Sequence, residues 1–217
     1  MLKQSGYEIT VINGGCRGYK SSQELVKLLR DVLPMKPDVV ISYTGVNDAS
    51  ENRRTKEYDK FPFLNSYQIC LEEAIARNVK YEHSVLEVDK NYTLGVESGI
   101  SRAERFIYNV KAMNGICNEF GIRYLAFLQP CLSLKQGGWS IYEQELLIST
   151  EMKQADFDYV NEFYEMVKKT PIECLKDISN LFHHYDDVYY DECHVTEKGN
   201  EIIAKCIYEV LVRERIV

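Results

Sequence analysis

The chain has 217 residues, of which 45% are hydrophobic and 27% are charged. These are the proportions of an ordinary soluble globular protein, which excludes a disordered or fibrous chain. Lys and Arg number 26 against 33 Asp and Glu, a formal net charge of −7, so we expect no nucleic-acid-binding surface, because phosphate binding needs clustered basic residues. No run of 18 apolar residues occurs, and we expect no membrane span.

The cysteines and the first residues bear on the cellular compartment. Seven cysteines are present, an odd number, and none forms a C-x-x-C pair. Residues 1–7 lack the apolar core of a signal peptide. We therefore expect reduced thiols and a cytoplasmic protein. We expect no metal and no other cofactor, since only Cys193 and His194 approach the close spacing of metal ligands.

The first part of the chain predicts two strands separated by a helix. Residues 8–13 are short and β-branched and end at two glycines, the pattern of a buried strand. Residues 21–33 place apolar side chains at helical spacing before a proline, and Ser21 or Ser22 is the expected helix cap. Residues 39–43 predict a second buried strand.

The rest of the chain continues this alternation around two irregular stretches. Residues 49–100 are polar, with one helix expected near residues 64–76, and residues 132–170 form a long excursion that ends in an acidic amphipathic helix. The other predicted elements are a helix over 102–120, a strand over 123–130, a short strand over 187–190 and a helix over 196–212.

Alternating strands and helices are typical of an α/β protein with a parallel sheet and helices on both faces. We therefore predict a three-layer α/β/α sandwich. No internal repeat or linker divides the chain, so residues 1–217 are expected to form one domain, in which residues 49–100 and 132–170 are insertions.

Ligands of an open parallel sheet bind beyond the carboxyl ends of its strands, and chemically useful residues follow three of the predicted strands. After the strand at 187–190, Asp191 stands three positions before His194. This spacing lets the carboxylate hold one ring nitrogen while the other acts as a general base. The alternative is a solvated histidine in a turn that opens a helix.

Two further segments at the predicted sheet edge offer hydrogen-bond donors. The side-chain amide of Asn47 and the backbone N–H of Gly18 could both bind a developing oxyanion, although turn formation is the alternative for each. Arg17 could meet an anionic substrate group, but an exposed loop arginine is the more common reading. Asp48, next to Asn47, is a further substrate-binding candidate.

Three blocks of sequence resemble those of the SGNH, or GDSL, hydrolase family. Val11–Gly18 matches V-x-N-x-G-x-x-G, Gly45–Asp48 matches G-x-N-D, and Asp191–His194 matches D-x-x-H before a helix. The resemblance implies a flavodoxin-like parallel sheet and a serine esterase site. It also implies that His194 is the base, Asp191 orients it, and Gly18 and Asn47 form the oxyanion hole.

The chain departs from that family at its first block. The family's nucleophile is the Ser of a G-D-S motif, and no G-D-S occurs in these 217 residues. In the family the strand that carries it lies between the equivalents of residues 8–13 and 39–43, so the first strand is expected to be missing here. We therefore expect an N-terminally shortened version of a longer protein. Cys16 is a weaker substitute, because a lone cysteine is more often a packing residue.

The resemblance implies hydrolysis of acyl esters, acetyl esters among them, with a small molecule or a carbohydrate as the alcohol. Two alternatives stay open. The chain could be a non-catalytic binding domain or degenerate enzyme of the same fold, or a carbohydrate O-acyltransferase with the same catalytic residues. The sequence leaves the oligomeric state open.

Overall fold

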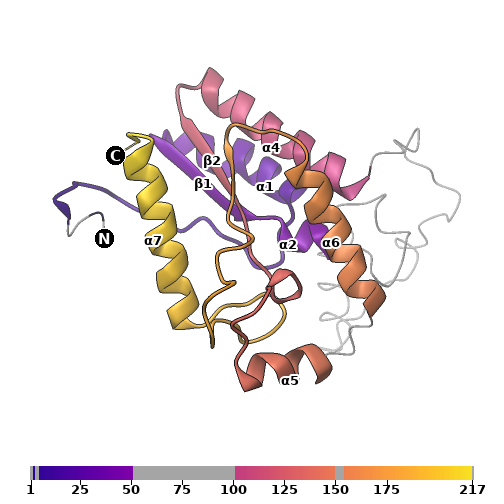
Figure 1. The fold of residues 1–217 in the computed structure, drawn as a ribbon. Helices are drawn as coiled ribbons and strands as arrows, with labels where there is room; N and C mark the ends of the chain where they lie inside the picture. The colour runs from indigo at the N-terminus through magenta and orange to yellow at the C-terminus, as the bar shows by residue number, and fades with distance from the viewer. Residues whose placement is uncertain (1, 3–4, 51–100, 150–153, 217) are drawn as a thin grey trace, which may run out of the picture.

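The computed structural model describes residue 2 and residues 5–50, 101–149 and 154–216. The helix expected near residues 64–76 lies outside the described residues. The described part is built on one sheet of parallel strands (Figure 1), which are, in order across the sheet, β1 (Val39–Thr44), β2 (Arg123–Leu128) and β3 (Leu175–Asp177).

Helices connect and cover these strands. The α-helices of the described part are α1 (Ser21–Lys27), α2 (Val46–Ala49), α4 (Arg102–Glu119), α5 (Ile141–Ser149), α6 (Gln154–Lys168) and α7 (Glu197–Arg213). Leu28–Val32 extends α1 as a π-helical turn, and 3₁₀ turns follow at Leu33–Met35 and Leu132–Leu134. Among the described helices, none is both long enough and apolar enough to cross a bilayer.

The two faces of the sheet are covered by different helices, as the side chains of β2 show. Tyr124, Ala126 and Leu128 lie in a cluster with α4 and α6, whereas Leu125 and Phe127 lie in a second cluster with α7. Successive side chains of a strand point to opposite faces. The predicted arrangement of helices on both faces of a parallel sheet is therefore confirmed (Figure 1).

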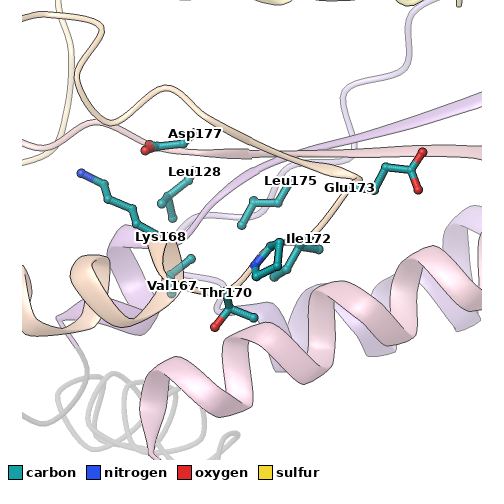
Figure 2. Close-up of a pocket in the computed structure, with 9 residues that line it drawn as sticks. Leu128, Val167, Lys168, Thr170, Ile172, Glu173, Leu175 and Asp177 are labelled. Carbon is teal, nitrogen blue, oxygen red and sulfur yellow. The ribbon is translucent and has the colours of Figure 1, made fainter.

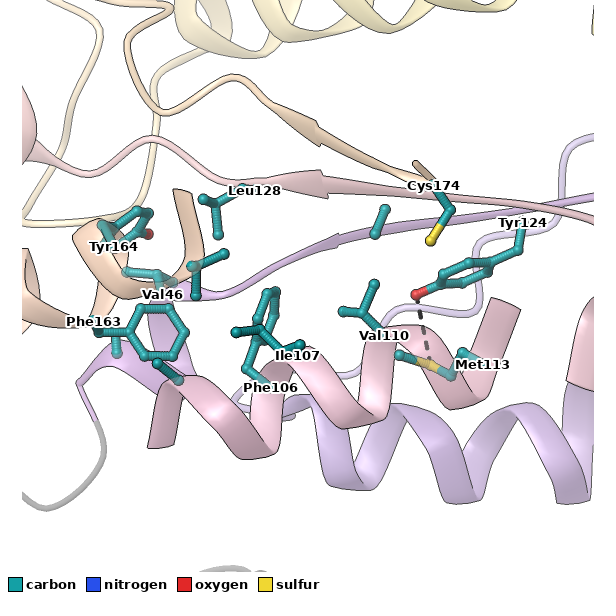
Figure 3. Packing of buried hydrophobic residues seen from close by; sticks show 14 of the residues in the cluster. Val46, Phe106, Ile107, Val110, Met113, Tyr124, Leu128, Phe163, Tyr164 and Cys174 are labelled. Atoms are coloured by element: carbon teal, nitrogen blue, oxygen red, sulfur yellow. Dashed lines mark hydrogen bonds between the residues drawn. The ribbon is translucent and has the colours of Figure 1, made fainter. Parts of the chain in front are cut away.

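The larger cluster lies between the sheet and α4 (Figure 3). The rings of Phe106 and Phe163 meet edge to face with their centroids 5.4 Å apart, and both side chains are almost fully buried. Each buried ring stabilises the fold by roughly 1.5–3 kcal/mol through loss of apolar surface from water. The hydroxyl of Tyr124 donates to the sulfur of Met113 at 3.6 Å, so the one polar atom of this ring has a partner.

Helix α4 begins and ends as its sequence predicts. The Ser101 hydroxyl accepts a hydrogen bond from the backbone N–H of Glu104 at 3.2 Å, and the Glu104 carboxylate accepts one from the Ser101 N–H at 2.8 Å. This capping box satisfies two N–H groups that have no partner within the helix. At the other end Gly121 has φ +68°, the left-handed conformation that closes a helix and favours glycine.

Helix α1 confirms the prediction for residues 21–33 but not its cap. The N-cap is Lys20, and Ser21 is already the first helical residue, so neither Ser21 nor Ser22 is the N-cap. The exposed N–H groups are satisfied in another way. The Lys20 N–H donates to the Gln23 side chain at 2.9 Å, and the Ser21 N–H donates to the carboxylate of Asp48, a residue of α2.

Two predicted strands are not strands of this sheet. Residues 8–13 form none, and Val11 and Ile12 are 77% and 66% exposed, because no described strand lies beside them to complete their backbone hydrogen bonds. Residues 187–190 contribute a single antiparallel bridge, between Tyr189 and Val195. The sheet contains β3 in their place. No strand was predicted there, because three residues are too few to show a sequence pattern.

Strand β1 lies at an edge of the described sheet. It pairs with β2 along its whole length, with Val39 opposite Arg123 at one end and Thr44 opposite Leu128 at the other. Within the described residues no strand pairs with its other side. Ile41, in its middle, is 41% exposed. The backbone groups on this side of β1 are therefore available to a further strand.

Glu24 of α1 is an acidic side chain in an unfavourable environment beside β1. Burial raises the pKa of its carboxyl to about 7, hydrogen bonding to Thr44 and Ser42 opposes the shift, and the nearby Asp48 charge adds to it. The free side chain has an ordinary value of 4.5. Between these values the folded protein holds a proton on Glu24 that the unfolded chain has released, so stability falls as the pH rises through this window.

We predict that Glu24→Gln stabilises the protein at about pH 8 and has little effect at about pH 4. The gain at the higher pH should be about 2–3 kcal/mol, since the amide avoids the cost of a buried ionisable carboxyl. Urea unfolding at the two pH values measures this difference. An equal change at both pH values would mean that Glu24→Gln acts through packing and not through ionisation.

Candidate active site

Asp191 and His194 form a hydrogen-bonded pair in the turn that leads into α7. The His194 Nδ1 lies 2.7 Å from the Asp191 Oδ2. Because a carboxylate can only accept, this bond places the Nδ1 proton on the imidazole and leaves Nε2 as a base. The His194 side chain is 64% exposed, so its ring is accessible from solvent.

The backbone of the same turn fixes the Asp191 carboxylate. Asp191 Oδ1 accepts the N–H of Cys193 at 2.9 Å and the N–H of His194 at 2.7 Å. Partial burial raises the pKa of Asp191, but these two N–H donors and the His194 ring together outweigh burial and hold the pKa below its usual range. The carboxylate is therefore ionised at neutral pH, as an orienting group for an imidazole must be.

A short antiparallel contact closes this turn. The Tyr190 N–H donates to the His194 carbonyl at 2.8 Å, and the Thr196 N–H donates to the Val188 carbonyl at 2.9 Å. Thr196 then caps α7, its hydroxyl accepting the N–H of Gly199 at 3.3 Å. The turn is thus held between a two-stranded contact on one side and a helix start on the other.

Asn47 lies in the short helix α2, directly beyond the carboxyl end of β1. The chain turns there at Gly45, which has φ +119°, and a Cβ on this residue would lie 2.7 Å from Leu128 Cδ1, so only glycine fits. The Asn47 Nδ2 donates to the carbonyl of Tyr19 at 2.9 Å. An amide nitrogen carries two donors, so this bond fixes the side chain and uses one of them.

Gly18 lies directly before Tyr19, and the Asn47 bond therefore links the Asn47 segment to the turn that contains Gly18. Gly18 is exposed and has φ +74°, a left-handed turn conformation in which glycine is unstrained. Arg17 lies in the same turn and is exposed. Cys16, also exposed, precedes it.

Asp48 has a structural position that the sequence analysis did not foresee. Its side chain is only 3% exposed, and its carboxylate accepts the Ser21 N–H at 3.0 Å and the Ser21 hydroxyl at 2.5 Å. Ser21 in turn accepts from the Asn109 amide at 2.9 Å. A negative charge at the start of α1 is favourable, and these bonds connect the Asn47 segment to α1 and α4.

The two halves of the site lie at the same edge of the sheet. Gln129 follows β2, and its N–H donates to the Thr44 carbonyl at 3.0 Å while its side-chain oxygen accepts the Val46 N–H at 3.3 Å. Leu132 donates its N–H to the carbonyl of Glu192, within the Asp191–His194 turn, at 2.9 Å. The residues after β2 thus contact both the Asn47 segment and the Asp191–His194 turn, and no motif in the sequence indicated this.

Among the described residues, Asp191, Cys193 and His194 form a group that could hold a metal ion, with ligand atoms within 4.8 Å of one another. Burial, followed by the charges of Asp191 and Glu192, raises the pKa of the Cys193 thiol to about 12. Without a metal ion the thiol therefore keeps its proton at neutral pH.

The parallel sheet with helices on both faces places this chain in the class of α/β proteins. Within this class, the family model described as "GDSL-like Lipase/Acylhydrolase" matches residues 2–207. The chain therefore belongs to the GDSL-like lipase and acylhydrolase family, and the resemblance drawn from the three blocks is confirmed. Among curated proteins, none matches the sequence.

Three solved structures are similar to this chain, and the first of them, with a TM-score above 0.5, supports the fold. The crystal structure of an acetyl xylan esterase, AlAXEase, is 18% identical with a TM-score of 0.53, over 97% of this chain and 86% of that one. A GDSL-like lipase from Bacteroides thetaiotaomicron VPI-5482 is 15% identical with a TM-score of 0.45, over 98% and 78%. A putative acylhydrolase from Bacteroides fragilis NCTC 9343 is 16% identical with a TM-score of 0.46, over 98% and 77%.

We predict that Asp48→Ala destabilises the protein by about 2–3 kcal/mol, because the Ser21 N–H and hydroxyl lose a charged, buried acceptor. Asp38→Ala is the matched control, since Asp38 is an exposed carboxylate directly before β1. Urea unfolding of both variants measures the difference. Unchanged stability of Asp48→Ala together with lost ester binding would instead support the substrate-binding role first assigned to Asp48.

Proposed function

We propose that this protein is a serine ester hydrolase in which His194 is the general base, Asp191 orients it, and Gly18 and Asn47 bind the oxyanion. The observation that carries the proposal is the 2.7 Å bond between His194 Nδ1 and Asp191 Oδ2. It occurs at the carboxyl edge of a parallel sheet in a member of an acylhydrolase family.

The proposed oxyanion hole rests on the hydrogen bond from Asn47 to the carbonyl of Tyr19. This bond orients an amide whose second N–H can donate to substrate, beside the backbone N–H of Gly18. Two donors held in advance stabilise the charge that develops on a carbonyl oxygen without reorganising during the reaction. Arg17, in the same exposed turn, is proposed to meet an anionic group of the substrate.

The nucleophile is proposed to be a serine of a G-D-S segment that these 217 residues do not contain. Two observations support a further strand in the sheet. Within the described residues, β1 has a strand partner on one side only, and the β-branched segment 8–13 is exposed and unpaired with any described strand. A strand that entered beside β1 would end at the edge where Asn47 and His194 lie.

In the proposed reaction the serine Oγ attacks the ester carbonyl carbon, and its proton passes to His194 Nε2. Asn47 and Gly18 donate to the oxyanion of the tetrahedral intermediate. The intermediate collapses, the C–O bond breaks, and the alcohol leaves with the proton from Nε2. Water then attacks the carbonyl carbon of the acyl-enzyme and gives a proton to His194. The bond between that carbon and the serine Oγ breaks, the Oγ takes the proton from His194 Nε2, and the acid is released.

Small acyl esters, acetyl esters of carbohydrates among them, are the proposed substrates. This step rests on analogy with the acetyl xylan esterase whose structure has the TM-score of 0.53, and a shared fold alone does not determine a substrate. Hydrolysis rates on p-nitrophenyl esters of increasing chain length test the acyl group. A preference for long chains would overturn the acetyl assignment.

A second candidate is a non-catalytic binding domain that keeps the cleft residues without a nucleophile, and the lack of G-D-S in the sequence favours it. The intact mass and N-terminal sequence of the protein from its native source separate the two. A mass several kDa above 25.2 kDa with an upstream G-D-S supports the serine esterase. A native start at Met1 supports the binding domain.

We predict that His194→Ala, in the protein carrying the upstream G-D-S segment, lowers turnover of p-nitrophenyl acetate by at least about 10³-fold, because the serine loses its base. The thermal midpoint should stay near that of the unchanged protein, since the ring is exposed. His184→Ala is the matched control, as His184 is also exposed. Equal turnover in the two variants would remove His194 from the mechanism.

We predict that Asn47→Ala lowers kcat roughly 10²-fold or more and changes KM little, because an oxyanion donor acts mainly in the transition state. Steady-state kinetics on the same ester provide the measurement. A loss below about threefold would instead mean that Asn47 only closes the turn after β1, through its bond to Tyr19.

A further inference from the structure

A buried ion pair lies beside the catalytic turn and takes no part in the proposed reaction. Lys135 Nζ is 2.6 Å from Glu143 Oε2, and the two side chains are 1% and 0% exposed. Removing two charges from water is costly unless further hydrogen bonds satisfy them. The partners of Glu143 therefore indicate why this pair is retained.

Both oxygens of the Glu143 carboxylate are used by backbone N–H groups. Oε2, besides Lys135, accepts the N–H of Ser140 at 3.0 Å, which forms a capping box at the start of α5. Oε1 accepts the N–H of Val188 at 2.9 Å and of Tyr189 at 3.2 Å. One carboxylate thus connects the first turn of α5 to a segment 45 positions along the chain.

That segment, residues 188–190, leads directly into the Asp191–His194 turn. Val188 accepts from Thr196, and Tyr190 donates to His194, so residues 188–190 fix the backbone on both sides of Asp191. A second bond comes from the same helix, since the Tyr142 hydroxyl donates to the Tyr190 carbonyl at 2.8 Å. Helix α5 therefore holds three consecutive residues that end directly before Asp191.

Apolar contacts join the same parts. Val188, Tyr189, Leu132 and Phe182 form one buried cluster with Ile203 of α7, and Leu146 and Leu147 of α5 pack against it. The rings of Phe182 and Tyr189 meet edge to face with centroids 5.4 Å apart. A movement of residues 188–190 would therefore disturb the packing of both α5 and α7.

We propose that Glu143 is a positioning residue for the Asp191–His194 pair, acting through the backbone of residues 188–190. This inference rests on the proposed function, because only that function makes the orientation of His194 by Asp191 important. Hydrogen bonding between a carboxylate and an imidazole depends steeply on distance and angle. Release of Val188 and Tyr189 lets Asp191 move and weakens the 2.7 Å bond that keeps the Nδ1 proton in place.

The test uses the protein with both charges removed, Lys135→Met with Glu143→Met, because removal of one partner alone would leave a buried charge uncompensated. The readout is the tautomer of the His194 ring in the ¹⁵N spectrum of histidine-labelled protein, at about pH 9, where an imidazole is neutral. His194→Gln identifies the signal. This readout needs no nucleophile and no substrate.

In the unchanged protein the Nδ1–H tautomer should dominate, and in the double variant it should become the minor form. Tyr142→Phe, which removes only the exposed bond to the Tyr190 carbonyl, should move the ratio in the same direction by less. Glu145→Gln is the matched control, because Glu145 lies exposed on the same helix, and it should leave the ratio unchanged.

The outcomes separate this proposal from the proposed function. If the unchanged protein lacks the Nδ1–H tautomer, the Asp191–His194 pair itself fails. If the unchanged protein has it and the folded double variant and Tyr142→Phe both keep it, Glu143 is only a structural residue and the positioning role is overturned. If the double variant does not fold, unchanged tautomers in Tyr142→Phe overturn the role, and a shift in that variant supports it.

Discussion

The parallel pairing of β1 with β2 is the constraint on which the candidate site depends. Six residue pairs, with Val39 opposite Arg123 at one end and Thr44 opposite Leu128 at the other, make both strands end at the same edge of the sheet. Whatever follows each strand must then meet there. Gln129, the first residue after β2, uses its backbone and side chain to bind the residues after β1. Asn47 and the Asp191–His194 turn lie next to this contact, so the register of the two strands sets the position of the candidate site residues.

Three buried acidic side chains illustrate different ways of accommodating a carboxyl inside this fold. The carboxyl oxygens of Asp48 and Glu143 accept backbone N–H groups, and each side chain connects segments far apart in the chain. Glu24 has fewer compensating donors, and burial raises the pKa of its carboxyl to about 7, so it takes up a proton at a higher pH than a free side chain does. Asp48 and Glu143 therefore fix the segments that hold the candidate site residues, whereas Glu24 makes the stability of the protein depend on pH.

Local signals predict part of the fold and of the site. The apolar stripe of α4 and the hydrogen bond between Asp191 and His194 act within one or a few turns of chain, so the sequence alone predicts the helix and this contact. Strand β3 is too short to show a pattern. The roles of Asp48 and Glu143 depend on partners 27 and 45 positions away. The S-x-x-E pattern at Ser140 could have indicated the start of α5, but not the segment that Glu143 binds.

The exposed side of β1 also matters for how the protein behaves in concentrated solution. The strand reads Val-Val-Ile-Ser-Tyr-Thr and contains no charged residue or proline, the devices with which proteins prevent edge-to-edge association. Residues 8–13 add a second β-branched segment whose Val11 and Ile12 face solvent. Within the described residues no strand pairs with this side of β1, so copies of the chain should self-associate through it as their concentration rises, and a peptide strand that covers this edge should act as a solubilising agent.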